Sequence, residues 1–128
     1  MKLRINGTSL RLRLTQGEVQ QLAETGEVQE QVPFSASATL TYRLKRDSKI
    51  KDITANYIGN LIEILIPERA SREWCATDRV TLEHSQPVPG GELRVTLEKD
   101  FACLAPRAGE DESDNFPHPQ APPGSPEC

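Results

Sequence analysis

LRLRL, residues 10–14, decides the fold, because leucine and arginine alternate along it. Side chains on a β-strand point alternately to opposite faces, so this stretch predicts a strand with one aliphatic and one basic face. KLRIN, residues 2–6, shows the same alternation and ends in Asn6-Gly7, a pair that favours a tight turn. Residues 2–14 are therefore predicted to form a hairpin whose leucines face the core.

Two short helices interrupt the strand pattern. Thr15 and Glu18 have the spacing of a capping box, in which the hydroxyl and the carboxylate bind free amide groups at a helix N-terminus. This spacing predicts a helix over residues 16–25 that Gly26 ends in a left-handed conformation. Pro67 is predicted to open a second short helix, since proline at the first helical position loses no hydrogen bond.

Alternating apolar residues predict further strands over residues 28–34, 40–44, 53–57, 61–66, 80–84 and 93–97. The most apolar of these runs, residues 61–66, suits a central strand that is covered on both faces. Helices and strands do not alternate regularly, so the pattern does not indicate a parallel sheet. The predicted fold class is mainly β: an antiparallel β-barrel or sandwich of about seven to eight strands, with two short helices and an irregular C-terminal tail.

Charge and proline content separate a C-terminal tail from this domain. The net charge of −4 arises beyond residue 106, because the residues before it carry equal numbers of basic and acidic side chains. Residues 1–104 are predicted to form a single β-rich domain, and residues 105–128 an acidic, proline-rich tail. Within the tail, residues 105–119 could pack on the domain and cover a sheet edge, whereas residues 120–128 are expected to be disordered.

The composition also argues against several classes of protein. No run of about 18 apolar residues is present, so no membrane-spanning helix is predicted, and the first residues alternate instead of forming an apolar signal core. A neutral domain with an acidic tail attracts a phosphate backbone weakly, which argues against nucleic-acid binding. The 3 cysteines form no metal-binding or redox spacing, so we expect free thiols and a cytoplasmic location.

Three motifs together resemble a known family. They are LRLRLT (residues 10–15) with Glu18-Val19, EKDFACL (residues 98–104) and EDESDNFPHP (residues 110–119). The chain resembles a family of small uncharacterised bacterial proteins over nearly its whole length. The resemblance implies one conserved architecture from the first strand to the tail, and it implies no known activity, substrate or cofactor.

The segment from Lys99 to His118 holds a mixed set of metal-ligand side chains. Thiolate and imidazole groups suit zinc, and carboxylates suit harder ions, so these side chains could converge on a divalent metal. The alternative interpretation is that the acids are solvated while Phe101 and Phe116 anchor the segment on the domain. The candidate metal ligands are Cys103, Asp111, Asp114 and His118.

Cys103 is also a candidate nucleophile or redox thiol. Such a role requires a lowered thiol pKa, and the acidic run beyond Cys103 would oppose thiolate formation. A buried structural cysteine is the alternative. A metal- or thiol-dependent enzyme centred on Cys103 and residues 110–118 is therefore the second functional hypothesis.

The first hypothesis is a non-catalytic binding or interaction module without a cofactor, whose partner is an unknown protein or a small anionic ligand. Outward side chains on neighbouring strands stand close together, so the hairpin over residues 2–14 should carry a basic patch. Cross-strand pairing with Glu27, Gln29 and Glu98 is the alternative use of these cations, and docking of the acidic tail is a third. The candidate ligand-binding residues are Arg4, Arg11, Arg13, Lys99, Asp100 and Cys103.

Overall fold

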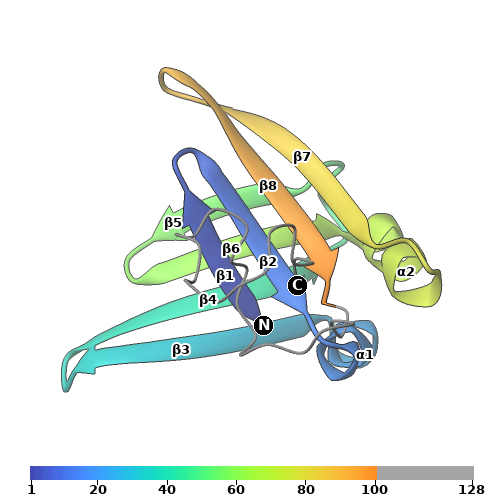
Figure 1. The fold of residues 1–128 in the computed structure, drawn as a ribbon, viewed down its shortest axis with the longest axis horizontal. Helices are drawn as coiled ribbons and strands as arrows, with labels where there is room; N and C mark the ends of the chain where they lie inside the picture. The colour runs from blue at the N-terminus through green and yellow to red at the C-terminus, as the bar shows by residue number, and fades with distance from the viewer. Residues whose placement is uncertain (101–128) are drawn as a thin grey trace, which may run out of the picture.

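The computed structural model describes residues 1–100, which form eight strands in two four-stranded sheets together with two helices (Figure 1). The sheets pack as a sandwich and do not close into a barrel, which decides between the two predicted arrangements. One sheet has the order β1 (Lys2–Asn6), β2 (Ser9–Leu14), β8 (Gly91–Lys99) and β7 (Thr81–Val88). The other has the order β3 (Glu27–Ser35), β4 (Ala38–Asp47), β6 (Leu61–Pro67) and β5 (Thr54–Ile58). The helices are α1 (Gln16–Thr25) and α2 (Glu68–Ala76).

The central pair of strands in each sheet is parallel, which differs from the antiparallel arrangement predicted. β2 runs parallel to β8, and β4 runs parallel to β6, whereas every hairpin pair is antiparallel. The parallel partners are far apart in sequence, so their pairing cannot be predicted from a local alternation of strands and helices. The helices connect one sheet to the other instead of crossing over within one sheet.

The second half of the domain repeats the topology of the first. Each half runs hairpin, helix, hairpin: β1–β2–α1–β3–β4 and then β5–β6–α2–β7–β8. Each sheet combines one hairpin from each half. Backbone hydrogen bonds repeat as well, because Thr41 N donates to Asn60 O at 2.8 Å and Arg94 N donates to Thr8 O at 3.0 Å, each joining a strand of one half to a hairpin turn of the other.

The ends of α1 confirm the local sequence signals. The Thr15 amide donates to Glu18 Oε1 at 2.9 Å, and the Glu18 amide donates to Thr15 Oγ1 at 3.3 Å, so the capping box is present. Gly26 follows α1 with φ at 79°, as predicted. α2 differs by one position, because Pro67 precedes the helix as its N-cap residue and Glu68 is the first helical residue.

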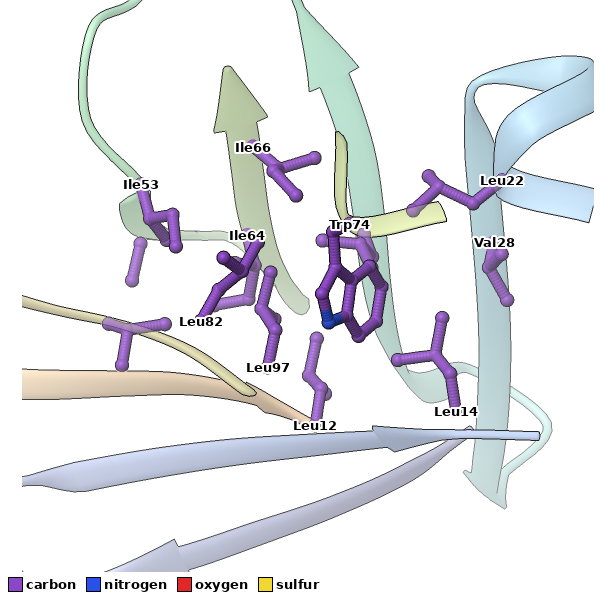
Figure 2. Packing of buried hydrophobic residues seen from close by; sticks show 13 residues of the cluster. Leu12, Leu14, Leu22, Val28, Ile53, Ile64, Ile66, Trp74, Leu82 and Leu97 are labelled. Atoms are coloured by element: carbon purple, nitrogen blue, oxygen red, sulfur yellow. The ribbon is translucent and has the colours of Figure 1, made fainter. Parts of the chain in front are cut away.

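The core lies where the two sheets meet the two helices (Figure 2). Leu22 of α1 and Trp74 of α2 are both fully buried, and they enter the space between the sheets from the same end. Strand residues complete this cluster from both sheets, including Leu14 and Leu97 of one and Ile66 of the other. Each sheet therefore buries its aliphatic face, which leaves the opposite faces available to solvent and ligands.

Candidate functional site

The outer face of the β1–β2 hairpin is basic. Leu12 is buried at 1% exposure, so alternation along β2 turns Arg11 and Arg13 to the opposite face. The antiparallel register places Arg4 beside Arg11 and Lys2 beside Arg13. These four residues are called the basic face below, and three of them were candidate ligand-binding residues from the sequence.

Glu98 on β8 is the acidic neighbour of the basic face. The register places it beside Arg13, and its carboxylate oxygens lie 3.5 Å from Arg11 Nε and 3.3 Å from Arg13 Nη2. This is one of the cross-strand pairings considered from the sequence. Because a single carboxylate faces two guanidinium groups, the two arginines keep an excess of positive charge.

Charged side chains on the outer face of the second sheet pair across neighbouring strands. Arg43 on β4 lies 3.0 Å from Glu27 Oε1 and 3.0 Å from Glu63 Oε2, on the strands to either side. Its Nε also donates to Gln29 Oε1 at 3.0 Å. The alternative that Glu27 and Gln29 pair with the basic face is therefore wrong, because β3 belongs to the other sheet.

A shallow hollow of about 360 Å³ adjoins the basic face on the outer side of the same sheet. Arg11 and Arg94 line it, and Arg94 Nε lies 3.6 Å from Glu83 Oε1. Both members of that pair are exposed, so the pair contributes little to stability and can open for a ligand. The hydroxyl groups of Ser85 and Thr96 also line the hollow, together with the carboxylates of Glu83 and Glu92, whereas the Ser9 hydroxyl donates to Asn6 O at 2.8 Å.

A larger groove of about 1240 Å³ lies between α1, the end of α2 and the end of β8. Val19 and Ala23 give it apolar surface, and Cys75 reaches it from α2. Lys99 and Asp100 line it from the end of β8. This interhelical groove opens where the described part of the chain ends.

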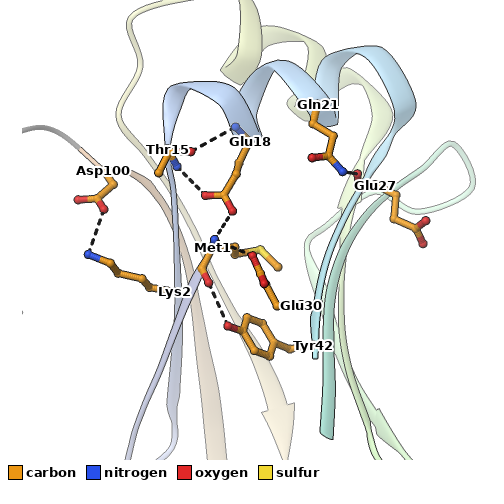
Figure 3. Close-up of polar contacts among 9 residues, drawn as sticks. All are labelled: Met1, Lys2, Thr15, Glu18, Gln21, Glu27, Glu30, Tyr42 and Asp100. Atoms are coloured by element: carbon orange, nitrogen blue, oxygen red, sulfur yellow. Dashed lines mark hydrogen bonds and ion pairs between the residues drawn. The ribbon is translucent and has the colours of Figure 1, made fainter. Parts of the chain in front are cut away.

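Lys99 and Asp100 do not join the arginines in one site. Lys99 Nζ donates to Thr77 O at 2.6 Å and lies 5.7 Å from the centroid of the Trp74 ring, so it is directed to α2. Asp100 Oδ2 lies 3.4 Å from Lys2 Nζ, at the border between the basic face and the groove (Figure 3). The candidate ligand-binding set is therefore divided between the two surfaces.

Cys75 is a half-buried thiol that the sequence reasoning passed over. Its Sγ lies 3.7 Å from the backbone oxygen of Val19 on α1. Burial raises the pKa of the Cys75 thiol, and this effect outweighs the nearby Ser71 hydroxyl and the positive charges of Lys99 and Arg46. A raised pKa keeps the thiol protonated near neutral pH, which does not suit a nucleophile.

A polar cluster at the N-terminus joins the two sheets (Figure 3). The ammonium group of Met1 contacts Glu18 of α1 and lies 3.2 Å from Glu30 Oε1 of β3. Tyr42 of β4 donates its hydroxyl hydrogen to Met1 O at 3.0 Å. Burial acts to raise the pKa of Glu18, but hydrogen bonds from the ammonium group and the Thr15 amide, with the ammonium charge, bring this pKa below its ordinary value of 4.5.

The remaining candidates lie outside the described residues. They are the thiol Cys103 and the metal-ligand candidates Asp111, Asp114 and His118, together with the packing predicted for residues 105–119 and the disorder predicted for residues 120–128. Within residues 1–100, no three His, Cys, Asp or Glu side chains are grouped so that they could hold a metal ion. In the same part of the chain, neither helix is long and apolar enough to span a bilayer.

Comparison with known proteins adds a family and no activity. No curated protein and no solved structure matches the chain. A family of unknown function (DUF7009) matches residues 1–120, a range that contains all the strands and both helices described above. The chain therefore belongs to this family of unknown function, DUF7009.

Proposed function

We propose that this protein is a non-catalytic cytoplasmic binding module that holds an acidic peptide segment of a protein partner on its basic face. The observation that carries the proposal is the pairing of like charges, with Arg4 beside Arg11 and Lys2 beside Arg13. Like charges directly opposite each other on neighbouring strands destabilise a sheet. Glu98 faces two of these cations, so the hairpin keeps an excess of positive charge, and binding of an anionic partner is the physical role that fits this excess.

The geometry of the basic face suits an extended peptide. Arg11 and Arg13 are two residues apart on one strand, so their side chains stand about 6.8 Å apart along the sheet. Alternate side chains of an extended peptide have the same spacing, so two alternate carboxylates can meet successive guanidinium groups. The adjoining hollow beside Arg94 extends this surface with further donors. A peptide carboxylate would compete with Glu98 for the arginines and form charge-assisted hydrogen bonds with them.

A fluorescently labelled glutamate decapeptide tests the proposal by anisotropy titration. We expect binding that weakens as salt rises, because the charges are exposed and screened. The Arg11→Gln/Arg13→Gln double variant should bind at least about tenfold more weakly, which corresponds to about 1.4 kcal/mol. The matched control is Arg69→Gln/Arg72→Gln, which removes the same charge from exposed positions of α2. Equal losses in both variants would show that net charge, and not the basic face, governs binding.

The chain itself contains an acidic segment of the proposed kind. Residues 110–114 read EDESD, and Asp100 at the end of β8 already pairs with Lys2 of the basic face. Ten residues of extended chain span about 33 Å, so residues 110–114 can reach any part of the hairpin. We propose that this segment competes with the partner peptide.

Neutralising the segment in the full chain tests the competition. In the variant Glu110→Gln, Asp111→Asn, Glu112→Gln and Asp114→Asn, the labelled decapeptide should bind several-fold more tightly, because a tethered competitor acts at an effective concentration in the millimolar range. An unchanged affinity would reject the competition and leave the basic face as the binding site. Loss of binding in the Arg11→Gln/Arg13→Gln variant tests the site itself.

A further inference from the structure

The interhelical groove has an apolar interior that no described residue fills. Val19 is half-buried and Ala23 is exposed along the groove side of α1, and the half-buried thiol of Cys75 faces them from α2. Its volume of about 1240 Å³ exceeds the roughly 300–1,000 Å³ of a typical small-molecule pocket, so a peptide segment fits it.

The described chain ends at this groove in a fixed direction. Asp100 lines the groove, and its amide donates to Leu14 O at 2.8 Å, which extends the pairing of β8 with β2 by one bond. The described chain therefore ends at the edge of the groove. The sequence there is FACL, residues 101–104, the last strongly apolar stretch before the acidic tail.

We propose that residues 101–104 of the same molecule dock in the interhelical groove, with Phe101 and Leu104 against Val19 and Ala23. Full burial of a side chain as large as Leu or Phe contributes about 1.5–3 kcal/mol, which favours the docked state over exposure of both side chains. The covalent connection also favours docking. Residues 101–104 follow Asp100 directly, so a segment tethered this close to the groove loses little entropy when it docks.

Two cysteines give a direct proximity test of the docked state. Cys75 lines the groove, and Cys103 lies in the proposed occupant, only three residues beyond Asp100. A disulfide forms only when the two Cα atoms approach to about 4.4–6.8 Å. Oxidation with diamide removes two protons and two electrons from the thiols, joins the sulfur atoms and reduces diamide to its hydrazine.

The crosslinking experiment uses the full chain with Cys128→Ser, so that Cys75 and Cys103 are the only thiols. We expect a Cys75–Cys103 disulfide by peptide mapping, formed at least about tenfold faster than the Cys75–Cys128 disulfide in the Cys103→Ser chain. The reaction is followed near pH 8.5 because the buried thiol must lose its proton to react. Equal rates for the two pairs would overturn the proposal.

A second variant separates docking from mere closeness along the chain. Phe101→Asp/Leu104→Asp keeps the tether but removes the apolar side chains, so the Cys75–Cys103 disulfide should form about tenfold more slowly. Alkylation of Cys75 by N-ethylmaleimide, in chains that also carry Cys103→Ser and Cys128→Ser, should become correspondingly faster. The matched control Ala108→Asp/Gly109→Asp adds the same charge farther along the tail and should change neither rate. An effect of the control as large as that of the Phe101/Leu104 variant would contradict docking in the groove.

Discussion

Trp74 connects α2 with both sheets. It is fully buried among aliphatic side chains of the core (Figure 2). Its indole Nε1 donates to Val80 O at 3.1 Å, so its polar atom is satisfied inside the core. The ammonium group of Lys99 lies 5.7 Å from the ring centroid, which adds a cation–π contact at the border of the groove.

Trp74→Ala should therefore lower the free energy of unfolding by about 3–5 kcal/mol, through lost burial and a cavity that the surrounding strands cannot close. Urea unfolding followed by circular dichroism measures the loss. Tyr57→Ala is the control, because Tyr57 is 70% exposed and its removal should change the free energy of unfolding by about 0.5 kcal/mol or less. If Trp74→Ala lowered the free energy of unfolding only slightly, α2 would not close the core as described.

The lowered pKa of Glu18 predicts how the stability of the protein depends on pH. Its pKa is lowered in the folded state, so its contribution is complete above the ordinary value of 4.5 and is lost as pH falls through the lowered value. The Glu18→Gln variant should be less stable than the parent at neutral pH, and the difference should vanish in acid. Urea unfolding at several pH values between about 7 and about 3 measures this difference. Glu24→Gln on the same helix is the matched control, because the Met1 ammonium group pairs with Glu18 and Glu30 instead.

At the scale of single residues, the predictable features were those that depend on neighbours in the sequence. Thr15 and Glu18 lie within one helical turn, so the capping box follows from their spacing alone. Glu18 also contacts the Met1 ammonium group, and this contact depends on β1 returning to the start of α1. The predicted hairpin provides that return, but the contacts of Met1 with Glu30 and Tyr42 also need the second sheet to pack beside it, and no local pattern encodes this packing.

Among the elements, α1 is defined most sharply, because both of its ends carry specific residues. Gly26 ends it at φ 79°, where a side chain is strained, and an added Cβ would lie 3.2 Å from Arg46 Nη2. Gly17 lies inside the helix, and an added Cβ there would meet no atom within 4 Å. The two glycines therefore make a matched pair of positions for one substitution.

Gly26→Ala should destabilise the domain by about 1–2 kcal/mol, because the left-handed conformation strains a residue with a side chain and Arg46 must also move. Gly17→Ala should stabilise the domain by about 0.5 kcal/mol, because alanine loses less backbone entropy in a helix than glycine. Thermal unfolding of both variants measures the opposite signs. If Gly26→Ala were as stable as the parent, the helix would have to end differently from the arrangement described.

The elements themselves were predictable, and their pairing was only partly so. Strand periodicity located the most apolar run correctly as β6, which lies between β4 and β5 in the centre of its sheet. The expectation that this strand is covered on both faces was wrong, because only the face with Ile64 and Ile66 is buried. The parallel pairing of β2 with β8 was missed, because it joins residues from the two ends of the domain.

The basic face depended on β1 and β2 alone, and it was foreseeable because a hairpin is a local structure. The groove needed both helices and the end of β8, so no local pattern predicted it.

In the whole molecule, the two halves exchange hairpins, so neither half contains a complete sheet. Residues up to β4 supply β1 and β2 to one sheet and β3 and β4 to the other. The second half supplies the parallel partner of each inner strand and so completes both sheets. The core residues divide in the same way, with Leu22 in the first half and Trp74 in the second. The two sheets are therefore built from two halves of the same topology, each of which completes the sheets of the other.

This interdependence predicts the outcome of cutting the chain between the halves, in the loop between β4 and β5. Fragments 1–50 and 51–128 should each lack a cooperative unfolding transition as monomers, because each leaves the apolar faces of two hairpins exposed. Mixed in equal amounts, they should form a one-to-one complex with strand-rich circular dichroism and a transition that rises with concentration. Light scattering distinguishes this complex from a fragment that pairs with itself through the repeated topology. A fragment that folds cooperatively as a monomer would refute interdependence, since its hairpins would then need no partner to bury their aliphatic faces.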